Sequence, residues 1–184
     1  MQIGIDSMNC TRGQRVTLAA PSGSEGTMAT HDTDALLMAL ERGPALLIPL
    51  IREVPVANLK RRPAPEKWSA HEHACHITTA HGLFLERLDR MLKEDNPAIK
   101  AYLPEDEHPE KLAGMDLDAS LATYVRERGD MVERLRALTP AQWERTGRHS
   151  EFSQYSIFIM FRHLFLHDML HAYRIEDLAF KRDW

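Results

Sequence analysis

Three histidines recur every four residues in the apolar segment FRHLFLHDMLHAYRIEDL, residues 161–178. They are His163, His167 and His171, and on an α-helix each lies about 40° around the axis from the next. Apolar residues share this side of the predicted helix, namely Met160, Leu164, Leu170 and Leu178. The spacing therefore places the three imidazoles in the middle of the stripe that should be buried.

A buried imidazole needs partners for its ring nitrogens, and leaving one unpaired costs about 1–3 kcal/mol. A divalent metal ion would supply that partner, because neutral imidazole is a good ligand for zinc, nickel, copper and iron. Two histidines four residues apart on one helical face can converge on a single ion. The alternative is that each histidine bonds a backbone carbonyl or another polar group. A metal site would need a third ligand from another helix.

A second group of histidines, in residues 67–92, could supply that ligand. The segment KWSAHEHACHITTAHGLFLERLDRML contains His71, His73, His76 and His81. His73 and His76 fall near the apolar side of this predicted helix, whereas His71 is expected to be exposed. The spacing does not choose between His73 and His76.

Both groups lie in segments with helical periodicity. Apolar residues at helical spacing predict four long helices, over about 31–54, 69–93, 118–137 and 153–181. No segment has the two-residue alternation that is typical of strands. These features predict an all-α protein, and the favoured architecture is a four-helix bundle.

Residues that favour helix ends occur where these helices should begin. Asp32 or Thr33 can cap the first helix. Ser69 and Glu72 have the spacing of a capping box, in which each side chain bonds the backbone N–H of the other residue. Thr139 precedes a proline and predicts a short helical turn before the last helix.

Prolines predict an interruption in the first helix and irregular connections after the first two. Pro44 and Pro49 each remove a backbone N–H donor, so we expect a kink or a break near Gly43. Residues 55–68 and 94–115 are polar and rich in proline, and we expect an extended connector and a loop.

The overall composition narrows the class of protein. A chain of 184 residues with 43% hydrophobic residues is long enough for one domain with a core. The net charge of -4 gives no electrostatic reason to expect nucleic acid or an anionic membrane as a partner. No run approaches the roughly 18 apolar residues of a membrane-spanning helix. Cys10 and Cys75 cannot form a disulfide framework, which favours a cytoplasmic location.

Residues 1–27 differ from the rest of the chain. They have no sustained periodicity, end in a stretch rich in Pro, Ser and Gly, and lack the pattern of a signal peptide. We expect a flexible leader, followed by the bundle over residues 28–184. One hypothesis is that Met28 is the natural translation start.

Two motifs together resemble the DinB-like superfamily, which is also called DinB/YfiT-like. The family pattern is W-S-x-x-E-x-x-x-H at the start of the second helix and H-D-x-x-H in the fourth. The matching residues here are Trp68, Ser69, Glu72 and His76, followed by His167, Asp168 and His171. The resemblance covers about residues 32–181, and it implies a four-helix bundle of the DinB/YfiT-like type and a homodimer.

The resemblance also implies a metal site. Carried over residue by residue, it gives His76, His167 and His171 as ligands of a divalent transition metal, with zinc or nickel expected. It thereby chooses His76 over His73, which becomes a second-shell residue, while His163 is expected in the second shell or the core. Three imidazoles leave an open coordination position for a water molecule or a thiol.

The resemblance to this family implies a metal-dependent thiol S-transferase, hydrolase or isomerase acting on a small molecule, with a low-molecular-weight thiol as co-substrate. A non-catalytic, stress-related binding module with a structural metal is the main alternative. A bundle without metal, in which the histidines satisfy one another, is a third. Nucleic acid and membranes are not expected as partners.

Three charged residues near the histidines are further candidates. Asp168 lies three residues before His171 and could accept a hydrogen bond from a ligand's second N–H; otherwise it is exposed and pairs with an arginine. Glu72, one turn before His76, could act as a catalytic base, although capping alone explains it. Arg174 is expected on the histidine face, where it could bind a substrate carboxylate or pair with an acidic residue.

Overall fold

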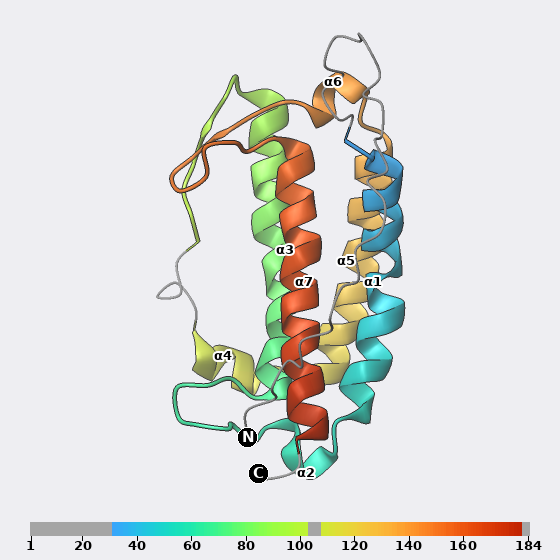
Figure 1. Ribbon diagram of the computed structural model, residues 1–184, viewed down its shortest axis with the longest axis vertical. Helices are drawn as coiled ribbons and strands as arrows, with labels where there is room; N and C mark the ends of the chain where they lie inside the picture. The colour runs from blue at the N-terminus through green and yellow to red at the C-terminus, as the bar shows by residue number, and fades with distance from the viewer. Residues whose placement is uncertain (1–30, 103–107, 182–184) are drawn as a thin grey trace, which may run out of the picture. The chain divides into compact units, whose positions relative to one another are not determined.

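A computed structural model describes residues 31–102 and 108–181, and the expectations about the leader, residues 1–27, lie outside these ranges. Four long helices form a bundle (Figure 1): α1 (Thr33–Glu53), α3 (Ala70–Lys93), α5 (Leu117–Arg136) and α7 (Ile157–Phe180). The predicted all-α four-helix bundle is thus confirmed. No helix within the described residues combines the length and the apolar character that a membrane crossing needs.

The order of the helices around the bundle brings α3 and α7 together. Each of these two helices packs against the other, α3 also packs against α5, and α7 against α1. Because α1 also packs against α5, the consecutive long helices α1 and α3 occupy opposite corners. The helices α3 and α7 run in opposite directions (Figure 1). The first half of α3 therefore lies beside the second half of α7.

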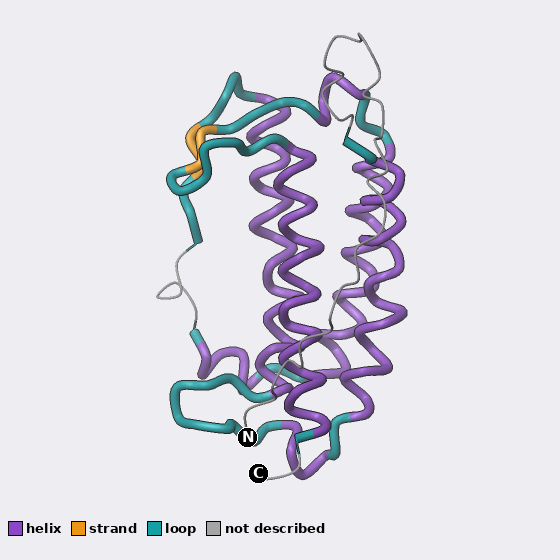
Figure 2. Tube along the Cα trace, viewed as in Figure 1, coloured by secondary structure: helices purple, strands orange, loops and turns teal. Residues whose placement is uncertain are grey.

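Short elements lie in the connections between the long helices (Figure 2). A helical turn, α2 (Val56–Leu59), follows α1. The connection between α3 and α5 contains β1 (Ala98–Ile99) and α4 (Pro109–Gly114). The connection between α5 and α7 contains α6 (Pro140–Trp143) and β2 (Arg148–His149), and β2 pairs in parallel with β1. Neither strand was expected, because two residues are too few to produce an alternating pattern.

The helix caps form as the sequence predicts. Asp32 accepts a hydrogen bond from a backbone N–H in the first turn of α1. Ser69 and Glu72 form the complete capping box of α3. Thr139 caps the short helix α6. These side chains fix where the helices begin, and Ser69 fixes the start of the helix that carries His76.

Of the two alternatives predicted for α1 near Gly43, a kink or a break, the break is wrong, because the helix continues through Pro44 and Pro49. Pro44 has no N–H to donate to the carbonyl of Leu40, one turn earlier. A guanidinium from α5 replaces that donor, since Nη1 of Arg128 lies 3.3 Å from the Leu40 carbonyl oxygen. A side chain on a neighbouring helix thus completes the hydrogen bonding that the proline interrupts.

A buried polar layer divides the interior of the bundle into two apolar clusters. One cluster includes Phe84, Met131 and Leu164, and the other includes Ile77, Leu121 and Ile175. The polar layer lies at intermediate positions along α3, α5 and α7 and consists of four residues with exposed fractions of 2% or less: His81, Tyr124, Arg128 and Asp168.

Candidate metal centre

Three imidazoles from two helices meet beside the polar layer. His76 comes from α3, and His167 and His171 come from α7, with one nitrogen of each within 4.8 Å of the others. Nε2 of His167 lies 2.9 Å from Nε2 of His76 and 3.2 Å from Nε2 of His171. Around a tetrahedral zinc ion, with Zn–N bonds of about 2.0–2.1 Å, adjacent nitrogens are about 3.3 Å apart. The triad, His76, His167 and His171, could therefore hold one divalent ion.

Burial keeps two of the triad imidazoles, His76 and His171, uncharged at neutral pH. Desolvation, with a smaller contribution from the nearby His167, lowers the pKa of His76 to about 4. The same two causes, in the same order, lower the pKa of His171. A neutral imidazole has a lone pair available for coordination, whereas an imidazolium has none. The environment of these two imidazoles therefore favours the protonation state that a metal ligand requires.

Aromatic residues of α3 and the segment before it surround His171 and His76. Nδ1 of His73 lies 2.8 Å from Nδ1 of His171, the nitrogen that faces away from the other triad residues. Trp68 packs against the triad, with its ring centroid 5.0 Å from that of His76 and 5.9 Å from that of His171. His73 thus lies where a second-shell residue holds the orientation of a ligand.

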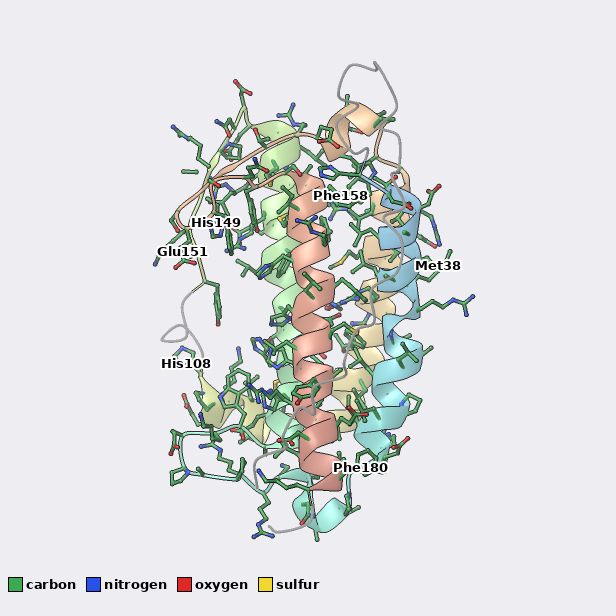
Figure 3. The ribbon with its side chains drawn as sticks, in the orientation of Figure 1. Met38, His108, His149, Glu151, Phe158 and Phe180 are labelled. Carbon is green, nitrogen blue, oxygen red and sulfur yellow. The ribbon has the colours of Figure 1, made fainter. Side chains whose placement is uncertain are left out.

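A pocket of about 470 Å³ opens beside the triad, and we name it the lateral pocket. Side chains of α3, α4, α7 and the β1 and β2 segments line it: His76, Thr79, Ala80, Leu83, Phe84, Arg87, Ala101, Tyr102, His108, Lys111, Leu112, His149, Glu151, Phe152, Tyr155, His163 and His167. His149 and Glu151, after the start of β2, lie on the same side of the bundle as His108, before α4 (Figure 3). Two triad residues, His76 and His167, therefore face a cavity large enough for a small molecule.

The sequence matches the family model of the DinB superfamily over residues 39–175. The chain belongs to the DinB superfamily. The solved structure of YfiT from Bacillus subtilis is similar in fold, with a TM-score of 0.74 at 21% sequence identity. The match covers 88% of this chain and 94% of YfiT, which is described as a probable metal-dependent hydrolase with an unusual four-helix bundle topology. No curated protein matches this chain.

Asp168, part of the H-D-x-x-H motif of this DinB-superfamily chain, is buried rather than exposed. Its Oδ2 accepts hydrogen bonds from Nη2 of Arg128 at 2.6 Å and from the hydroxyl of Tyr124 at 3.1 Å. Its Oδ1 lies 3.6 Å from Nδ1 of His167. The expectation that Asp168 serves His171 is therefore corrected, because the carboxylate faces the other histidine of the motif.

Arg128 and the hydrogen bonds around Asp168 stabilise the ionised carboxylate. Burial alone would raise the pKa of Asp168, but the nearby imidazole of His167 and the charge and hydrogen bond of Arg128 outweigh it and lower the pKa. Nη2 of Arg128 also lies 2.8 Å from Nε2 of His81. Neither Arg128 nor Tyr124 was expected at the site from the sequence. One feature of the sequence could have identified Arg128: it is a charged residue on the apolar face of α5, between Tyr124 and Met131.

Glu72 is occupied by structural contacts. Its carboxylate accepts hydrogen bonds from the guanidinium of Arg62 and from the backbone and hydroxyl of Ser69. Burial would raise the pKa of Glu72, but these hydrogen bonds outweigh it and lower the pKa. Within the described part of the chain, no hydrogen bond or ion pair joins Glu72 to the triad. The capping role accounts for this residue, and the structure gives no support to a role as a base.

Three expectations about exposure are wrong. Arg174 is exposed and does not line the lateral pocket, so it is not the buried guanidinium that was expected. His163 is also exposed and lines the lateral pocket, so it does not lie in the core. His71 is only 2% exposed, and its Nε2 lies 3.6 Å from Sγ of Cys75.

Acid is expected to destabilise the metal-free protein because buried histidines resist protonation. Burial is the largest cause that lowers the pKa of His76 to about 4 and that of His81 to about 3. In the unfolded chain both pKa values return to about 6.5. The unfolded state therefore binds protons first as the pH falls, and the stabilisation that is present above about pH 6.5 is lost on acidification.

Between pH 7.5 and 5.5, each of these two histidines is expected to lower the free energy of unfolding by on the order of 1 kcal/mol. Chemical denaturation at pH 7.5 and 5.5 measures this loss. The variant His81→Gln, which has no group that titrates in this range, should lose less stability over the same interval. Equal losses in the two proteins would contradict the assignment of His81.

Proposed function

We propose that this chain is a metal-dependent enzyme that acts on a small molecule bound in the lateral pocket. The ion, zinc or nickel, would be held by His76, His167 and His171. One observation carries the proposal: two of the three triad imidazoles line a cavity of about 470 Å³. A catalytic metal keeps a coordination position for water or substrate, and here that position would face the pocket.

The ion would supply Lewis acidity, which lowers the pKa of a water molecule or a thiol at the open position. The protein would supply orientation and shielding. His73 holds the far nitrogen of His171, and Asp168 lies near the far nitrogen of His167. Trp68 packs against the rings of His76 and His171 and would help to hold their orientation.

Three reactions are candidates, and their need for a thiol divides them into two testable classes. A hydrolase would transfer water to an ester or an amide, and a thiol S-transferase would transfer a thiol to an electrophile; a thiol-dependent isomerase would consume no thiol. The test is an assay of zinc-loaded and nickel-loaded protein against a panel of electrophiles and esters. Each compound is assayed with and without glutathione, bacillithiol or mycothiol.

Consumption that requires a thiol supports the transferase or the isomerase, and turnover without thiol supports the hydrolase. The control is the variant His167→Ala, treated with the same metal. Turnover that is equal in the control and in the wild type would overturn the proposal, because the reaction would not depend on the triad.

The alternative is a non-catalytic, stress-related module in which the metal is structural. Such a site is usually closed by four protein ligands. Among the described residues, the cluster of possible ligands has three members. His73 is the nearest additional histidine, but its contact is with the outer nitrogen of His171. The cavity that His76 and His167 line supports an open site and therefore an enzyme.

The homodimer, the cytoplasmic location and the absence of nucleic-acid binding stay predictions.

A further inference from the structure

A second polar group of the lateral pocket lies on α3 far from the triad. Arg87 is 8% exposed, and its guanidinium donates to the hydroxyl of Tyr155 at 3.1 Å and to the carbonyl of Lys100 at 2.7 Å. A guanidinium has five N–H donors, so these two bonds leave donors available. Among residues 31–102 and 108–181, no carboxylate forms an ion pair with Arg87. A buried cation of this kind favours an anionic partner.

Arg87 and His76 lie on the same face of α3. They are eleven residues apart, which corresponds to about 20° around the axis and about 16 Å along it. The turns between them contribute Ala80, Leu83 and Phe84 to the pocket wall. Along α3, the wall therefore consists of a triad imidazole, then Thr79, then the apolar side chains of the next two turns, and finally a guanidinium.

The described lining of the pocket favours a negatively charged occupant. Arg87 and Lys111 carry permanent positive charges, whereas Glu151 is the one carboxylate among the lining residues that the structure describes. Nδ1 of His149 accepts hydrogen bonds from the backbone N–H groups of Glu151 and Phe152, at 3.2 and 3.3 Å. This bonding leaves Nε2 of His149 as the N–H donor of the ring.

We propose that the lateral pocket binds an elongated small molecule whose carboxylate pairs with Arg87 and whose apolar body packs on Ala80, Leu83 and Phe84. Its reacting group lies at the triad, on the order of 10 Å from the carboxylate, because both side chains extend into the pocket. This assignment rests on the proposed function for the position of the reacting group. The carboxylate could belong to the substrate that reacts or to a thiol co-substrate.

Binding of a matched pair of probes to the full-length, metal-free protein tests the proposal. Isothermal titration calorimetry compares 4-phenylbutanoate with its neutral isostere 4-phenylbutanamide. The wild type is expected to bind the carboxylate at least about tenfold more tightly, which is the effect of one charge-assisted hydrogen bond. In Arg87→Met the two affinities become equal. No binding of the carboxylate to the wild type, or a preference that survives in Arg87→Met, overturns the proposal.

A control and a second measurement guard against misfolded variants. Arg90→Met removes a guanidinium of α3 that pairs with Glu94 on the surface and does not line the pocket, so the preference should persist. In the wild type, 4-phenylbutanoate should shift the Nε–H NMR signal of Arg87, which Arg87→Lys assigns, and the amide should not. An unshifted signal overturns the proposal without any comparison of variants.

Glutathione distinguishes the two sources of the carboxylate. Displacement of 4-phenylbutanoate by glutathione, but not by its diethyl ester, supports binding of a thiol co-substrate at Arg87. If neither displaces the probe while Arg87 still binds it, the carboxylate belongs to the reacting substrate. These measurements use neither metal nor turnover. If the triad proves inactive, the results of these binding measurements do not change. If the protein is active but shows no preference for the carboxylate, only the role of Arg87 is contradicted.

Discussion

Replacing His167 with alanine is expected to abolish stoichiometric metal binding. Its Nε2 is the central donor of the triad, 2.9 Å from that of His76 and 3.2 Å from that of His171. Without it, the remaining two imidazoles come from different helices. The affinity for zinc should fall by more than the 10–100-fold that is typical of a second-shell change. Elemental analysis of protein purified without a histidine tag, followed by a competition titration with a chelator, measures the loss.

His163→Ala is the matched control for this experiment. His163 lies on the same helix, one turn before His167, and is exposed in the lateral pocket. The control variant should keep about one ion per chain. His73→Ala should show an intermediate loss, because His73 contacts the outer nitrogen of His171. Equal metal content in His167→Ala and the wild type would end the case for a triad site.

The long helices were predictable from sequence because each repeats its apolar positions over several turns. Their caps were predictable as well, since Ser69 and Glu72 act locally on a single helix end. The two strands and α4 were not, because elements of two to six residues are too short to repeat an apolar pattern over several periods. The continuity of α1 also escaped prediction, since the donor that compensates for Pro44 comes from Arg128, 84 positions further along the chain.

The errors on α7 have one cause, which is the position of the buried stripe. The sequence places its centre at His167, partly because of Leu170, which is 54% exposed in the structure. The stripe is instead centred near Ile175, about 80° further around the axis. The triad histidines of α7 therefore lie toward the edge that faces α3. The same rotation buries Asp168 and exposes His163 and Arg174.

The choice between His73 and His76 shows what spacing cannot decide. Both residues contact the histidines of α7, His73 through Nδ1 of His171 and His76 through Nε2 of His167. Which of them reaches the centre of the cluster depends on how α3 is rotated against α7. That rotation is set by packing over the whole bundle, so the family pattern identified His76 where the helical period could not.

Removing the carboxylate of Asp168 is expected to destabilise the metal-free protein by about 3–5 kcal/mol, because it leaves a buried guanidinium without its counter-ion. Asp168 and Arg128 are each 1% exposed at the side chain and are 2.6 Å apart. The variant Asp168→Ala also leaves the hydroxyl of Tyr124 without its acceptor. Denaturant unfolding at pH 7.5, far above the range in which the buried histidines titrate, measures the change in free energy.

The surface pair Arg134–Asp89 provides the comparison, since its side chains are 42% and 48% exposed. Asp89→Ala should cost no more than about 1 kcal/mol, because water replaces the lost partner. Equal losses for the two pairs would show that the pair of Arg128 and Asp168 is no more stabilising than a surface contact.

The double variant Arg128→Met with Asp168→Ala distinguishes the contribution of the ion pair to stability from that of the other contacts in the polar layer. Removing both charges abolishes the uncompensated cation, so most of the loss in Asp168→Ala should be recovered. The recovery should be incomplete, because Arg128 also donates to the carbonyl that Pro44 leaves open in α1 and contacts His81. A residual loss of about 1 kcal/mol would correspond to that carbonyl, left buried without a donor. The polar layer would then stabilise α1 and the carboxylate beside His167 through the same guanidinium.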